Sequence, residues 1–176
     1  MTPAELAAAM NIPIARAQKW ADALTAAMAD GQINTRLRIA AFLAQIGHES
    51  GSLVYSKELG GPSYFAKYEG RKDLGNTQIG DGVKFPGRGL IQVTGRANYV
   101  KASQALFGDD RLIKTPELLE QPEWAAKSAV WYWTTRNLNA LADADRFTDI
   151  TRAINGGTNG LEDRKARYRY ALTGLK

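Results

Sequence analysis

The chain has 176 residues, enough for one domain with a substantial core, and 44% of them are hydrophobic and 23% charged, as in an ordinary globular protein. It has no cysteine and one histidine, which excludes disulfides and thiolate metal sites and argues against zinc. The net charge of +5 indicates an acidic partner, either nucleic acid or a bacterial envelope. No apolar run is long enough to span a bilayer, and Met1–Glu5 does not resemble the start of a signal peptide, so we expect synthesis in a cytosol.

Two helices are predicted in the first thirty residues. Thr2-Pro3-Ala4-Glu5 is a capping box with proline at the first helical position, which predicts a short helix to about Met10. The second helix is predicted by apolar residues at helical spacing, and Gly31 ends it. These residues are Ile14, Ala17, Ala21, Leu24 and Met28.

The next predicted helix is apolar nearly all round. Asn34-Thr35 caps it, and the run Leu37–Ile46 is typical of a buried helix. It leads into His48, Glu49 and Ser50-Gly51. The helix macrodipole and desolvation would both favour the protonated form of the Glu49 carboxyl. A carboxyl that stays protonated near neutral pH can serve as a general acid.

A second glutamate follows nine residues later. Glu58 lies in a polar, glycine-rich segment beside Lys57, a setting that favours the ionised carboxylate. Two carboxyl groups whose surroundings differ in this way suggest an acid and a base. Glycoside hydrolysis uses such a pair.

Residues 59–89 form a glycine-rich loop that we expect to contain turns or short strands, and a loop of this length is usually functional. Its aromatic residues could stack on sugars, although we expect at least half to anchor the loop on the core. They are Tyr64, Phe65, Tyr68 and Phe85. If the following segment is extended, Gln92 and Thr94 share a face that could hold water or sugar hydroxyls. The alternative is an edge strand with two solvated side chains.

The remainder is predicted to be helical, with an irregular linker over residues 112–119. Helices are expected at residues 96–107, from Pro122, from Phe147 to Asn155 and after Gly160, which makes the fold mainly α. The three tryptophans of the helix from Pro122 are expected in the core. The last helix carries four cations, which either form a solvated face or contact an anionic envelope. These cations are Arg164, Lys165, Arg167 and Arg169.

Several of these stretches match the motifs of one enzyme family. They are His48–Gly51, Tyr68–Asn76, Gly80–Gly82, Phe85–Tyr99 and Ile154–Gly157. Together they resemble glycoside hydrolase family 19, and its phage endolysin branch more closely than the plant chitinases. The resemblance extends from about Thr35 to Tyr170, and the stretch Phe85–Tyr99 is its most specific part.

The resemblance implies a lysozyme-like, two-lobed helical domain in which a glycine-rich excursion of loops and short strands lines a cleft. Residues 1–176 would form a single catalytic domain without a separate wall-binding module. The implied function is that of an endolysin, which hydrolyses β-1,4 bonds of peptidoglycan glycan strands with inversion. The implied enzyme is a monomer without metal or organic cofactor and binds no nucleic acid. It would remain in the host cytoplasm until a holin-type pore opens the membrane.

The resemblance also assigns roles to individual residues. Glu49 corresponds to the general acid and Glu58 to the base at the endolysin spacing. Glu69 lies at about the spacing of the plant enzymes and is the alternative base, although we expect it to be a structural partner of Arg71 or Arg88. Thr94 would help to hold the attacking water. The implied substrate contacts are His48, Tyr68, Arg88, Gln92, Asn98 and Asn155.

Two other functions compete with this one. A chitinase would also cleave between N-acetylglucosamine units, so chitin is the alternative substrate. A non-catalytic sugar- or nucleic-acid-binding domain is the second alternative, which the basic composition favours and the two glutamates oppose.

Overall fold

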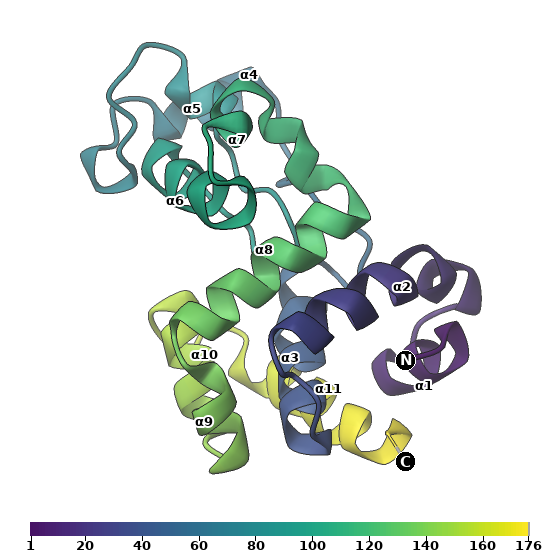
Figure 1. Cartoon of the computed structure of the whole chain (residues 1–176). Coiled ribbons are helices and arrows are strands. Elements are labelled where there is room, and N and C mark those ends of the chain that lie inside the picture. Colours follow the sequence, from purple (N-terminus) through teal and green to yellow (C-terminus); the bar gives the residue numbers. More distant parts are fainter. Residues whose placement is uncertain (176) are drawn as a thin grey trace.

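The computed structural model describes residues 1–175, and the chain is mostly helical (Figure 1). The expected domain, residues 1–176, extends one residue beyond this described part. The helices of the first half are α1 (Pro3–Met10), α2 (Ile14–Asp30), α3 (Arg36–Glu49), α4 (Pro62–Phe65), η1 (Ala66–Tyr68), η2 (Lys72–Leu74) and α5 (Asp81–Lys84). Those of the second half are α6 (Arg96–Phe107), α7 (Arg111–Lys114), η3 (Pro116–Glu120), α8 (Pro122–Thr135), α9 (Leu138–Asp143), α10 (Phe147–Asn155) and α11 (Leu161–Gly174). The η segments are single 3₁₀ turns. None of the described helices is long and apolar enough to cross a membrane.

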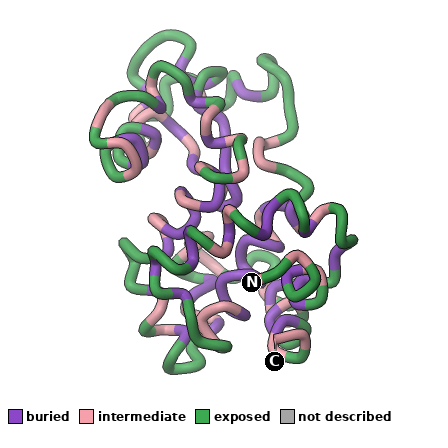
Figure 2. Tube along the Cα trace, turned by 45° about the vertical axis from the view of Figure 1, so that its right-hand side comes forward, coloured by how far each residue is buried: buried purple, intermediate pink, exposed green. Residues whose placement is uncertain are grey.

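The helices form two lobes joined by α8. One lobe holds α1–α3 and α9–α11, the other holds α4–α7, and α8 runs from one to the other (Figure 1). Helix α3 is buried through most of its length and packs against α11, α1 and α9. Phe42 of α3 meets Trp133 of α8 edge to face, with ring centroids 5.4 Å apart. Buried backbone runs through the interior of the molecule, and exposed segments lie at its outer loops (Figure 2). The expected mainly α, lysozyme-like fold is confirmed.

The second lobe is held together by polar contacts as well as by apolar packing. Asp81 is buried at the start of α5 and accepts hydrogen bonds from Nε and Nη2 of Arg96 in α6, at 2.8 and 2.6 Å. The Tyr99 ring packs on Phe85, and its hydroxyl donates to the Pro86 carbonyl at 2.7 Å. These contacts tie the glycine-rich loop to α6.

The expected short strands are reduced, within residues 1–175, to isolated bridges between Lys57 and Arg88 and between Arg88 and Val93. Gln92 has a φ of 57°, so the chain turns at this position instead of continuing as a strand. Gln92 and Thr94 are therefore placed by a tight turn, so the extended backbone on which their predicted shared face depended is not formed, although both line one groove.

Two further parts of the helical prediction need correction. The segment expected to be an irregular linker contains α7 and η3, and the sequence pattern did not predict α9. Such short helices are not stable in isolation and depend on tertiary packing. In α9 that packing comes from Leu138 and Ala142, which are buried.

Candidate active site

Glu49 is the last residue of α3, and its carboxylate is 20% exposed. Ser50 ends the helix, where its hydroxyl donates to the Ile46 carbonyl at 2.6 Å and accepts from the Leu53 amide at 2.9 Å. Arg164 of α11 donates from Nη2 to Glu49 Oε1 at 2.5 Å. Burial and the helix dipole at Glu49 were predicted from the sequence, but this positive partner was not.

A buried polar network fixes the position of Arg164. Its Nη1 donates to Gln45 Oε1 at 2.6 Å, and its Nε donates to the Asn159 carbonyl at 3.2 Å. Gln45 in turn donates to Thr151 Oγ1 at 2.9 Å. Side chains of α3, α10 and α11 thus hold the Glu49 carboxylate in one place. Gln45 was the available signal for this network, because a polar side chain inside an apolar helix requires a partner.

Glu58 lies in the loop after α3 and accepts hydrogen bonds at both carboxylate oxygens. Tyr68 and Lys67 donate to Oε1 at 2.9 and 3.2 Å. The Gly87 amide donates to Oε2 at 3.2 Å. Burial, and then the hydrogen bond to Glu58, raises the pKa of Tyr68, so its hydroxyl remains a donor near neutral pH. Tyr68 therefore positions the carboxylate of Glu58.

Gly87 brings Glu58 next to the two polar residues of the following turn. A Cβ atom on Gly87 would lie 2.5 Å from Gln92 Oε1 and 3.2 Å from Thr94 Oγ1, so the Gly87 backbone lies directly against both side chains. The Thr94 hydroxyl donates to the Gln92 carbonyl at 2.9 Å, and Asn98 donates to the Thr94 carbonyl at 2.8 Å. The structure thus gathers Glu58, Gln92, Thr94 and Asn98 in one cluster.

A groove of about 1080 Å³ runs between α6 and the 91–94 turn on one side and α8 with the end of α10 on the other. Its polar and aromatic lining includes Gln92, Thr94, Asn98, Trp131 and Tyr132. Glu58 adjoins the first wall through the contacts at Gly87.

Glu49 is connected to the second wall of the groove through its partner Arg164. Arg164 donates to the Asn159 carbonyl, to which Asn155 also donates, and Asn155 follows Ile154 of the groove lining. The side chains of Glu49 and Glu58 are each 20% exposed. Glu58 is thus connected to the first wall and Glu49 to the second, each through hydrogen-bonded neighbours.

Glu69, the alternative base, holds a backbone turn. Its Oε1 accepts from the Gly80 amide at 2.7 Å and its Oε2 from the Gly82 amide at 2.8 Å. The prediction that Glu69 pairs with Arg71 or Arg88 is wrong. Arg71 pairs with Asp73 at 2.5 Å, and Arg88 pairs with Glu120.

Arg88 is buried and bonded within the protein. Its guanidinium donates to Glu120 at 2.7 Å, to the Lys84 carbonyl at 2.9 Å and to the Tyr99 hydroxyl at 3.1 Å. Only 3% of the residue is exposed. This position differs from the substrate contact that the sequence suggested and gives Arg88 a packing role.

His48 and Asn155 position α11 and the turn before it. His48 Nδ1 lies 2.7 Å from Asp163 Oδ2, and the ring packs so closely on Gly160 that a Cβ there would clash with it. Asn155 donates to the Asn159 carbonyl and accepts from the Gly157 amide, both at 2.9 Å. Both residues thus support the segment that carries Arg164.

Several groove residues were not predicted from the sequence. Trp131 had been assigned to the core with the other tryptophans, but it is half-buried and lines the groove. Trp133 is buried as expected. Among the loop aromatics, Phe65 and Phe85 are buried, which confirms that half of them anchor the loop.

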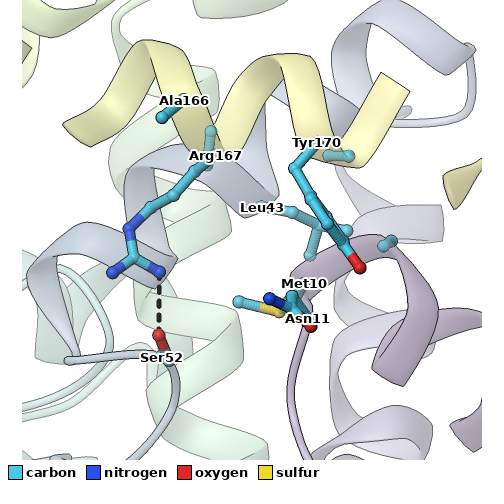
Figure 3. A pocket seen from close by; sticks show the side chains of 10 residues that line it. Met10, Asn11, Leu43, Ser52, Ala166, Arg167 and Tyr170 are labelled. Atoms are coloured by element: carbon cyan, nitrogen blue, oxygen red, sulfur yellow. Dashed lines mark hydrogen bonds between the residues drawn. The ribbon is translucent and has the colours of Figure 1, made fainter. Parts of the chain in front are cut away.

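A smaller pocket of about 300 Å³ lies where α1, α3 and α11 meet (Figure 3). Met10, Leu43 and Tyr170 line it, and Arg167 donates to the Ser52 hydroxyl at its edge at 2.8 Å. Among the described residues no carboxylate lines this pocket. It therefore lacks the acid–base pair that the groove has.

Known proteins resemble this chain in sequence and in structure. A family model described as chitinase class I matches residues 9–146. A glycosyl hydrolase family 19 domain-containing protein of Haemophilus influenzae is 35% identical over 162 residues, which is 76% of this chain and 78% of that protein. Chitinase 6 of Oryza sativa subsp. japonica is 33% identical over 125 residues, and the alignment covers 70% of this chain but only 44% of the rice protein.

Two solved structures share the fold over nearly the whole chain. A bacterial family 19 chitinase superposes with a TM-score of 0.77 at 27% identity, covering 99% of this chain and 95% of that one. Chitinase C from Streptomyces griseus gives a TM-score of 0.75 at 26% identity, with coverage of 98% and 92%.

Proposed function

Since the chain belongs to glycoside hydrolase family 19 and is a chitinase-like glycosidase, we propose that it hydrolyses β-1,4 bonds in the glycan strands of bacterial peptidoglycan. The observation that carries this proposal is a pair of partly exposed carboxylates, Glu49 and Glu58, each connected by hydrogen-bonded neighbours to one wall of the same groove. Family membership removes the alternative of a non-catalytic binding domain.

In the proposed mechanism Glu49 donates a proton to the leaving glycosidic oxygen. Glu58 takes a proton from a water molecule that attacks the anomeric carbon from the opposite face of the sugar. Thr94 helps to orient that water, because its hydroxyl lies beside Gly87, whose amide holds Glu58. Arg164 holds the carboxylate of Glu49 in place and balances its charge once the proton has left.

Peptidoglycan is favoured over chitin by charge. The protein carries a net charge of +5, whereas chitin is neutral and peptidoglycan bears carboxylates on its peptide stems. Chitin hydrolysis is the second candidate, because relatives in sequence and structure are chitinases.

The test compares reducing ends released from purified sacculi and from colloidal chitin by the wild-type enzyme and by Glu49→Gln. Glutamine keeps an acceptor for Arg164 but cannot donate the acidic proton, so we expect a folded variant with at least a hundredfold lower rate. Release from chitin alone would reject peptidoglycan as the substrate. Appreciable turnover by Glu49→Gln would remove Glu49 from the acid role.

A further inference from the structure

The groove between α6 and α8 has only positively charged side chains among the charged residues of its lining. Lys101 of α6 and Arg136, which caps the C-terminus of α8, are its only charged lining residues, and no Asp or Glu from the described chain lines it. We call Lys101 and Arg136 the cationic pair.

The cationic pair has no carboxylate partner within residues 1–175. Other cations that support the fold are neutralised, as in the ion pairs Arg96–Asp81 and Arg164–Glu49. The Arg136 guanidinium lies over the Tyr132 ring, 3.4 Å from its centroid, with one weak hydrogen bond to the Tyr132 carbonyl at 3.4 Å. Most of its five N–H donors therefore remain available to a ligand.

Both cations lie about one helical turn from groove residues next to the proposed catalytic pair. Lys101 follows Asn98 by three residues on α6, and Arg136 follows Tyr132 by four at the end of α8. At 1.5 Å per residue these offsets are about 4.5 and 6 Å along the helix axes. A glycan held in the groove would thus place a neighbouring sugar unit within reach of these cations.

We propose that the cationic pair binds a carboxylate of the peptide stem attached to this neighbouring sugar and so selects peptide-bearing glycan over neutral glycan. The proposal rests on the proposed function, because it assigns a specificity contact to the same groove. Charge-assisted hydrogen bonds from an arginine and a lysine would hold the carboxylate, with the groove wall excluding part of the solvent. A chitin chain offers no such group, so the pair contributes nothing specific to its binding.

The first test measures selectivity in the double variant Lys101→Gln/Arg136→Gln. We expect the ratio of kcat/KM for soluble peptide-bearing glycan to that for chitin oligosaccharides to fall about tenfold, mainly through KM. The matched control Lys19→Gln/Arg111→Gln removes the same two charges at exposed positions outside the groove and should keep the wild-type ratio. An unchanged ratio in the groove variant would overturn the proposal.

The second test measures binding without turnover, in the Glu49→Gln protein, by titration calorimetry. The probe is a soluble glycan–peptide fragment, compared with the same fragment after its carboxylates have been converted to amides. We expect about tenfold weaker binding of the amidated fragment, and this difference should disappear when the cationic pair is also replaced by glutamine. Equal affinity for both fragments would overturn the cationic-pair proposal even if sacculi are cleaved. Failure of the wild-type enzyme to cleave sacculi would reject the proposed function separately.

Discussion

At the residue scale, the position of Glu49 depends on a side chain 115 residues away in the sequence. Arg164 is buried, and its guanidinium contacts Glu49, Gln45 and the Asn159 carbonyl. Removing one partner of a buried ion pair leaves the other partner without compensation. The position of the Glu49 carboxylate therefore depends on the packing of α11 on α3.

Arg164→Leu should lower the free energy of unfolding by about 3 kcal/mol, because Glu49 and Gln45 would lose their shared donor. Chemical denaturation followed by circular dichroism measures this loss. Arg169→Leu is the control, since Arg169 is exposed on the same helix and should change stability little. Equal changes in the free energy of unfolding in the two variants would show that the Arg164 network stabilises the fold no more than an exposed arginine does.

Glu58→Gln and Glu69→Gln separate the two candidate bases. Glu58→Gln should reduce kcat roughly a hundredfold or more, because an amide cannot accept the proton of the water. Glu69→Gln should act mainly on the stability of the Gly80–Gly82 turn, whose amides its carboxylate accepts. Steady-state rates on soluble glycan and melting temperatures of both variants identify the base. A large loss of kcat in Glu69→Gln with little loss in Glu58→Gln would make Glu69 the base.

Sequence motifs singled out Glu49, Glu58, Gln92 and Thr94, and the structure places Gln92 and Thr94 in the groove lining, with Glu58 next to them through Gly87. Their catalytic roles stay predictions. The network around Arg164 could not be predicted in this way. Local patterns do not reveal which distant cation meets a given carboxylate, and Arg164 had been grouped with exposed arginines. The Gln45 side chain showed only that some partner was required.

At the element scale, the glycine-rich loop is held to α6 by Asp81 and Arg96. The hydrogen bonds from Arg96 lower the pKa of Asp81 below its ordinary value of 3.8. A carboxyl whose pKa is depressed in the folded state stabilises the fold above its unfolded pKa. This contribution is lost as the pH falls from 3.8 through the folded value.

Asp81→Asn should lower the free energy of unfolding at pH 7 by roughly 2 kcal/mol and make stability less dependent on pH below about 4. Denaturation midpoints at about pH 7 and pH 3 give both quantities. Asp73→Asn is the matched control in the same loop, because the Asp73–Arg71 pair is exposed and such pairs contribute little. A pH profile of Asp81→Asn identical to that of the wild type would contradict this role for Asp81.

The long helices were predictable, and the short ones were not. Capping residues and apolar spacing gave α1, α2, α3 and α6 nearly to the residue. The loop helices, α7 and α9 have too few residues to show a period, and their stability comes from contacts with the rest of the fold. The turn at Gln92 was missed because a left-handed backbone at a glutamine has no clear sequence signal.

At the scale of the whole molecule, the groove lies between α6 with the 91–94 turn on one side and α8 with the end of α10 on the other. The positive charge of the protein is less concentrated on the last helix than the sequence suggested. Arg164 is buried, Arg167 pairs with Asp163 at 2.7 Å, and Lys165 lies 3.6 Å from Glu162. Three of the four cations of α11 are thus paired within the protein, and contact of this helix with an anionic envelope stays a prediction.

The central claim is that Glu49 and Glu58 act as acid and base on opposite faces of one sugar. Proton NMR during cleavage of a soluble β-1,4-linked glycan fragment tests it most directly, because it identifies the anomer formed before mutarotation. A direct attack by water assisted by Glu58 predicts that the first product carries an α-configured reducing end. A β-configured first product would contradict the account, since it would require a covalent intermediate in place of the water held by Glu58.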